Sequence, residues 1–240
     1  MTDETSTIIG LIGDACTNNQ IRYLLRNLKT DDPQIRVSGG SDILLNQLKS
    51  AYHRGSLSMD DLRVLLASGE ENGRQHIFFY RPKQGHASDF RDPNEVASRL
   101  WGNRWRSSMG FPQFHLSPTE MEWGDFRIDF KPDLKNPEWT IKIYAGRQIE
   151  KLLDVVEKPS GNSILITKKL ERKWIRLVWV IKWRPRGLLE IRVPAVQRES
   201  LSACREERDQ VWEMVRKGIQ RSSFNPLDLQ PAMNALVSTA

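Results

Sequence analysis

The sequence has few residues of the kinds that bind metal ions or form covalent cross-links. Cys16 and Cys204 are its only cysteines among 240 residues, and they lie far apart without C-x-x-C spacing. The four histidines, which form no H-x-x-x-H or mixed Cys/His ligand set, are His53, His76, His86 and His115. We therefore expect no structural zinc, no cofactor and no disulfide framework, and a reducing intracellular compartment, either cytoplasm or nucleus.

Long hydrophobic runs and targeting segments are also missing. No apolar run approaches the roughly 18 residues of a membrane span, and the acidic, polar start of the chain lacks the charged segment and apolar core of a signal peptide. The sequence contains no nucleophile elbow, phosphate loop, dinucleotide fingerprint or kinase signature. These absences predict a soluble protein with no membrane partner and no catalytic residues of the common enzyme classes.

What the sequence does have is an excess of positive charge and many tryptophans. Its 36 Lys and Arg residues outnumber 30 Asp and Glu residues, for a net charge of +6, and it contains eight Trp residues. Apolar residues make up 39% of the chain and fall in periodic blocks, which indicates a folded protein of one large or two small domains. The basic balance favours polyanions as partners, although +6 is also within the range that ordinary solubility requires.

The most strongly patterned stretch runs from residue 171 to residue 194. Alternate positions from Ile175 to Trp183 are apolar, whereas the positions between them include Arg176 and Lys182, which is the period of a half-buried strand. Residues 184–187, Arg-Pro-Arg-Gly, allow the chain to reverse because proline restricts φ and glycine tolerates positive φ. This pattern predicts a β-hairpin with one apolar face.

The predicted hairpin also contains most of the chain's positive excess. Its cations are Arg172, Lys173, Arg176, Lys182, Arg184, Arg186 and Arg192. Against these seven stand Glu171 and Glu190, which leaves a local balance of +5. One interpretation is that Lys and Arg keep an edge hairpin soluble and block edge-to-edge pairing. The other is that cations on a rigid sheet, interleaved with Trp, bind phosphates and stacked bases.

Residues 1–72 are predicted to form a small helical domain. Apolar residues at helical spacing follow Asn18 and Asn19, either of which is a candidate cap, and a second helix follows a turn at residues 38–40 with Ser41 or Asp42 as its cap. A third helix is predicted after Ser58, where Asp61 completes a near capping box.

Part of this helical domain has the pattern of a known module. Leu24, Leu25 and Leu28 lie on the first helix, Ile35 lies in the linker, and residues 38–48 form a Ser-Gly turn followed by a leucine-bearing helix. Residues 20–52 thereby resemble the SAP family, a helix–extended loop–helix module that binds double-stranded DNA. Ser41 stands where the family has a lysine, and the loop is longer. The resemblance implies a DNA-binding module, and the alternative is a plain three-helix packing unit.

Residues 73–124 are predicted to contain a strand at 74–82, a short helix with Pro93 at its first position, and a connector. A helical module followed by the strand HIFFYR and a later Trp-rich strand also resembles the centromere protein N family of kinetochore DNA binders. A second basic-aromatic cluster, a candidate stacking platform for nucleic acid, consists of Arg99, Arg104, Arg106 and Trp105. Such a tryptophan also serves as a core anchor beneath a snorkelling guanidinium.

Residues 125–222 are predicted to form an α/β domain, followed by a tail at 223–240. Strands are expected at 126–130, 139–144 and 163–169, and the spacing of apolar residues predicts a helix at 147–157. A long charged helix is expected from about residue 199. The fold class is therefore α+β, with a mostly antiparallel sheet that helices cover on one face. The other face, with Arg127, Lys142, Arg176, Lys182 and Arg192, is expected to be open to solvent or ligand.

One group of residues partly matches an enzyme motif. Asp133, Glu138 and Lys142 partly match the Asp…Glu-x-Lys pattern of metal-dependent nucleases, in which two carboxylates hold a divalent ion beside a lysine. Glu138 and Lys142 are four positions apart instead of two, so their backbones would stand roughly 13 Å apart on a strand. The sequence therefore predicts a non-enzymatic protein that binds nucleic acid, most simply double-stranded DNA, within a larger complex. The alternative is a protein-interaction adaptor that uses Trp and Arg as interface anchors.

Overall fold

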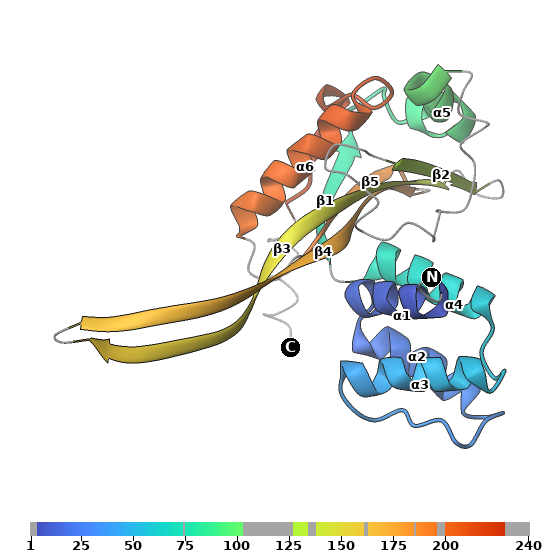
Figure 1. The fold of residues 1–240 in the computed structure, drawn as a ribbon. Helices are drawn as coiled ribbons and strands as arrows, with labels where there is room; N and C mark the ends of the chain where they lie inside the picture. The colour runs from blue at the N-terminus through green and yellow to red at the C-terminus, as the bar shows by residue number, and fades with distance from the viewer. Residues whose placement is uncertain are drawn as a thin grey trace, which may run out of the picture.

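The computed structural model describes residues 4–73, 75–102, 127–133, 138–160, 163–184, 186–195 and 200–228. The protein has an α+β fold, as the sequence predicts, with four helices preceding an antiparallel sheet (Figure 1). The sheet lies between the N-terminal helices on one side and the later helices on the other. This layering determines which side chains of the sheet can reach a partner.

The N-terminal helices form a domain with its own core. They are α1 (Glu4–Ala15), α2 (Asn18–Leu28), α3 (Ser41–His53) and α4 (Met59–Asn72). Their shared apolar cluster includes Ile8, Ile12, Ile21, Leu25, Ile35, Leu44, Leu48 and Leu62. The capping box of Ser58 and Asp61 begins α4, as expected, whereas α2 is capped by Thr17 instead of an asparagine and α3 begins after Gly40 without a side-chain cap.

The turn before α3 depends on one of its two glycines. Gly39 has a φ of +123°, and a Cβ there would lie 2.8 Å from Cγ2 of Ile43, whereas Gly40 has a φ of −74° and open space around it. We expect Gly39→Ala to lower the free energy of unfolding by about 1–2 kcal/mol, because L-residues are strained in this region. The matched Gly40→Ala variant should stay within about 0.5 kcal/mol. Urea unfolding followed by circular dichroism measures both, and equal losses would contradict the turn geometry.

Six described strands form one sheet in the order β2-β3-β4-β5-β1-β6, and every neighbouring pair is antiparallel. The strands are β1 (Gln75–Pro82), β2 (Arg127–Asp133), β3 (Glu138–Ser160), β4 (Ser163–Arg184), β5 (Leu188–Pro194) and β6 (Phe224–Pro226). The predicted hairpin is confirmed: β4 and β5 pair across a turn in which Gly187 has a φ of +71°.

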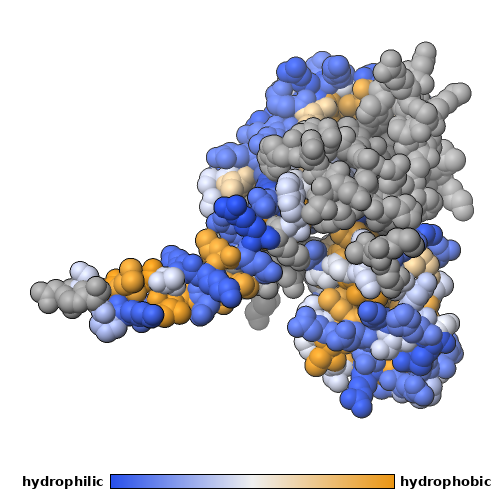
Figure 2. Space-filling model, viewed as in Figure 1, coloured by the Kyte–Doolittle hydropathy of each residue, from blue (hydrophilic) through white to orange (hydrophobic). Residues whose placement is uncertain are grey.

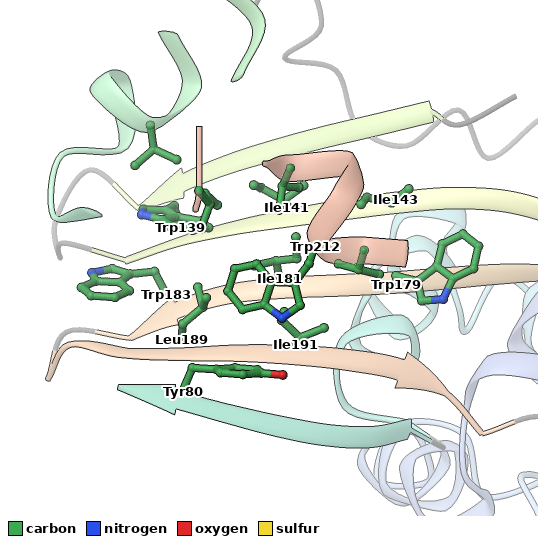
Figure 3. Close-up of a cluster of buried hydrophobic side chains, with 14 of the residues drawn as sticks. Tyr80, Trp139, Ile141, Ile143, Trp179, Ile181, Trp183, Leu189, Ile191 and Trp212 are labelled. Atoms are coloured by element: carbon green, nitrogen blue, oxygen red, sulfur yellow. The ribbon is translucent and has the colours of Figure 1, made fainter. Parts of the chain in front are cut away.

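The apolar face of β4 forms the centre of the second core (Figure 3). Trp179, Ile181 and Trp183 point into it, as the period-two pattern predicts. Helices α5 (Pro93–Trp101) and α6 (Leu201–Val215) cover this face, with the short helices η1 (Ser88–Phe90) and η4 (Arg221–Ser223) beside them. The Trp139 and Trp183 rings stack with 6.3 Å between their centroids. The expected start of α5, with Asp92 as cap and Pro93 in the first turn, is also confirmed.

Two expectations about local structure are wrong. Residues 147–157 are not a helix, because β3 continues to Ser160 and pairs with β4 along its length, and a bulge between Leu152 and Asp154 interrupts the alternation and mimics helical spacing. The tail expected from residue 223 begins instead with β6, in which Phe224 is buried in the core of the sheet domain. The segment 75–102 also belongs to this core, through β1 and α5.

Candidate functional site

The sheet face opposite the tryptophans was expected to be open to a ligand, and this expectation is wrong for the described cations. The side chains of Lys142, Arg176 and Arg192 are almost fully buried there, and Lys182 is mostly buried. They lie beneath the C-terminal end of α4, which places Glu70 and Glu71 against them. The Arg127 side chain is outside the described part of the structure. The basic face is therefore largely neutralised from within the chain.

Glu70 is the centre of this buried charge network. Its side chain is only 1% exposed, and its carboxylate accepts hydrogen bonds from Arg176 Nη2 at 2.6 Å and from Lys142 Nζ at 3.2 Å. Glu71 is within 3.1 Å of Lys142 Nζ and 3.9 Å of Lys182 Nζ. The Arg176 guanidinium also lies over the Tyr144 ring, 4.6 Å from its centroid. Buried charges are tolerated only when they are paired, so this network ties α4 to the sheet.

A second group of ion pairs joins Arg184 and Arg192 to Glu190. Glu190 accepts hydrogen bonds from Arg184 Nε at 2.7 Å and from Arg192 Nη2 at 2.6 Å. Burial alone would raise the pKa of the Glu190 carboxyl, but these hydrogen bonds and the two positive charges outweigh burial and lower its pKa. Arg192 also donates to the Glu71 backbone oxygen and to Asn72 Oδ1. Arg192 therefore connects β5 to the same end of α4.

The other predicted site residues do not converge. Arg172 is 71% exposed and lies 3.4 Å from Glu150, and Arg186 is exposed in the turn after β4. At about 3.3 Å per residue, roughly 40 Å of strand separates Arg172 from Arg184. Arg99 donates to the Asp89 and Glu95 backbone oxygens. The side chain of Lys173 and the residues Arg104, Trp105 and Arg106 lie outside the described residues.

The nuclease arrangement does not assemble around Lys142. Its ammonium is engaged by Glu70 and Glu71, whereas the backbone register sets Glu138 opposite Asp133 at the far end of the β2–β3 pair. Within the described ranges, no three His, Cys, Asp or Glu side chains form a group that could hold a metal ion. Neither cysteine is in a disulfide, both are buried, and burial together with the Glu70 charge raises the pKa of the Cys16 thiol to about 12.

The feature that the sequence analysis missed is a projecting β-ribbon. Beyond residue 144 β3 has no β2 partner, and before residue 180 β4 has no β5 partner, yet the two strands stay paired with each other to Ser160 and Ser163. Figure 1 shows this ribbon extending away from both domains. We call residues 150–160 and 163–172 the arm. The outer edges of its two strands are unpaired with any other described strand.

The arm exposes an unusual number of aliphatic side chains. They are Leu153, Val155, Val156, Ile164, Leu165, Ile166 and Leu170, and Figure 2 shows hydrophobic residues along the projecting ribbon. Ser-Gly-Asn-Ser at 160–163, between two runs rich in β-branched residues, was the available hairpin signal. The residues before it also fit a helical period, which is why the sequence predicts a helix at 147–157.

No described helix is both long enough and apolar enough to cross a membrane. A scan against protein-family models found no match, and searches of curated proteins and of solved structures also found no match.

Proposed function

We propose that this protein is a non-enzymatic interaction subunit that docks a partner protein through its arm. The observation that carries the proposal is the exposure of seven aliphatic side chains on a ribbon that touches neither domain core. Exposed clusters of apolar side chains mark interaction sites in soluble proteins. The proposal develops the adaptor hypothesis of the sequence analysis, with the arm replacing Trp and Arg as the anchor.

Two physical arguments support a protein partner. An isolated two-stranded ribbon is marginally stable in water, and burial of each half-exposed aliphatic side chain would contribute about 1 kcal/mol. The free outer edges also offer backbone N–H and C=O groups to an added strand, a common mode of peptide recognition. A partner that covers the arm would supply both contributions together.

The charges of the arm favour a protein partner over a nucleic acid bound through its phosphates. Its cations are Lys151, Lys158, Lys168, Lys169 and Arg172, and its carboxylates are Glu150, Asp154, Glu157 and Glu171. Five against four leaves a balance of +1, whereas phosphate binding needs a marked local excess of cations. The stronger cation cluster, on the sheet, is already paired with Glu70, Glu71 and Glu190.

Duplex DNA is the second candidate partner. It is favoured by the exposure of Lys168, Lys169 and Arg172 on a two-stranded ribbon, an element that the major groove of B-DNA admits. The SAP-like segment at residues 20–52 would then supply a second contact. Purified protein titrated onto duplex DNA at two salt concentrations tests this candidate, because phosphate contacts lose affinity steeply with added salt.

A photo-crosslinking residue separates the two candidates. We expect a crosslinker in place of Ile164, which is 67% exposed on the arm, to give a discrete protein adduct in the cells that produce the chain. The control position is Val64, a β-branched residue that is 69% exposed on α4, and it should give none. The adduct should disappear when Ile166 and Leu170 are both changed to Thr. A nuclease-sensitive adduct would favour DNA instead, and adducts that are equal at the two positions would overturn the proposal.

A further inference from the structure

We propose that the partner of the arm is the arm of a second copy of this chain. The inference rests on the proposed function, since it names the protein that covers the ribbon. The pair would be a symmetric dimer in which the same surface of both copies meets.

The register of β3 against β4 shows which side of the arm each residue occupies. Directly opposite residues share one face of a ribbon, so Val155 lies beside Lys168, Glu157 beside Ile166 and Pro159 beside Ile164. Leu170, two residues before Arg172 and two after Lys168, extends the same side of β4. We call the outer part of this side, made of Val155, Glu157, Pro159, Ile164, Ile166, Lys168 and Leu170, the docking face. Nearer the base of the arm the same side continues with Glu150 and Arg172, which already lie 3.4 Å from each other. The reverse side pairs Asp154 with Lys169 and Val156 with Thr167, and is the more polar of the two.

The docking face is complementary in charge to itself. Its charged members are one carboxylate, Glu157, and one ammonium, Lys168, in neighbouring rows of the ribbon. Among the described residues neither group has an ion-pair partner. When two such faces stack, Lys168 of one copy comes within reach of Glu157 of the other, and each charge is met by its opposite. Aliphatic residues then meet aliphatic residues around this pair.

A partner of strongly acidic or basic character would fit this face less well. Such a partner would bring one charge sign against a surface that carries both signs equally, and like charges across an interface are costly. A second copy brings a ribbon of the same length, the same aliphatic density and the two required charges. The complementary surface is therefore present on the chain itself.

The size of the arm limits how tightly two copies can bind each other. Residues 150–160 span roughly 35 Å and a two-stranded ribbon is about 10 Å wide, so two stacked faces bury less than the roughly 1,200 Å² of a standard interface. We therefore expect a reversible dimer with a Kd in the micromolar range. Sedimentation equilibrium of the full chain from about 1 µM to about 200 µM brackets such a Kd.

Charge reversal gives the decisive test. Glu157→Lys and Lys168→Glu should each weaken the dimer about tenfold or more, because each puts like charges in contact across the interface. The double variant, Glu157→Lys with Lys168→Glu, should return the Kd to within about threefold of the original protein. Ile164→Thr with Ile166→Thr should also weaken the dimer, whereas Val156→Thr with Leu165→Thr, the matched change on the reverse side, should leave it unchanged. Far-UV circular dichroism checks that every variant remains folded.

The outcomes separate this inference from the proposed function. A chain that stays monomeric at every concentration, or a double reversal that fails to restore the dimer, overturns self-association. If the chain is monomeric but a crosslinker at position 164 still gives an adduct with a different protein, the arm keeps its proposed function with another partner. If the Ile164 adduct is also absent, both proposals fall.

Discussion

Glu70→Ala is expected to lower the free energy of unfolding by about 3–5 kcal/mol, because it leaves buried positive charges without their counter-ion. The Glu70 carboxylate is hydrogen-bonded to Arg176 and Lys142, and the side chains of both cations are at least nine-tenths buried. Nε and Nη1 of Arg176 have no hydrogen-bond partner in the described part of the chain, so the guanidinium depends on Glu70 at Nη2. Urea unfolding measures the loss.

The matched control is Glu150→Ala. This carboxylate also lies near an arginine, Arg172 at 3.4 Å, but both side chains are exposed, so the change should stay within about 0.5 kcal/mol. Arg176→Met in the Glu70→Ala background should recover part of the loss, since the unpaired charge is then removed. A Glu70→Ala effect as small as the control would mean that α4 does not cover the sheet as described.

A second readout follows from the positions of the tryptophans. No tryptophan precedes residue 101, so the N-terminal helices contribute nothing to indole fluorescence, whereas far-UV circular dichroism reports on both domains. If Glu70 couples the unfolding of the two domains, the two signals should change at the same urea concentration in the original protein. In Glu70→Ala they should change at different urea concentrations. Transitions that remain coincident in the variant would argue against this coupling.

Trp179→Ala should cost about 3–5 kcal/mol, the range for truncation of a large buried aromatic side chain. The Trp179 ring lies in the core between the sheet and α6 (Figure 3), and its Nε1 donates to Glu207 Oε2 at 3.0 Å. Glu207 is buried and also accepts from Arg147, so the loss of the indole removes one of the partners of a buried carboxylate. Trp179→Ala therefore leaves a cavity in the core and also removes a hydrogen bond to the buried Glu207 carboxylate, and both changes lower stability.

Trp174→Ala is the matched control, on the same strand and with the same chemical change. Trp174 is only partly buried, near the base of the arm, so its truncation should cost less than about 1.5 kcal/mol. Indole fluorescence in urea is a suitable measure for both variants. A loss in Trp174→Ala as large as in Trp179→Ala would mean that the core of the sheet domain extends further toward the arm.

Local features of the fold could be predicted from the sequence because neighbouring residues produce them. The alternation from Ile175 to Trp183 indicated which side of β4 faces the core, and Arg184 to Gly187 indicated where the chain reverses. Ser58 with Asp61 marked the start of α4, and Asp92 with Pro93 marked the start of α5. Each depends on side-chain period or on hydrogen bonds within a few residues, which the order of amino acids already contains.

The candidate site depended on tertiary structure. A period of two showed that Arg176 and Lys182 lie opposite the core, but it could not show that Glu70 and Glu71, about a hundred residues earlier, would cover that face. The arm was hidden for a related reason: a bulge after Leu152 breaks the alternation, and only pairing with β4 distinguishes a strand from a helix there. The sequence by itself determined the secondary structure where one local pattern dominates. Tertiary contacts alone decided which charges are neutralised and which apolar residues are left exposed, because burial depends on what packs against a face and not on the face itself.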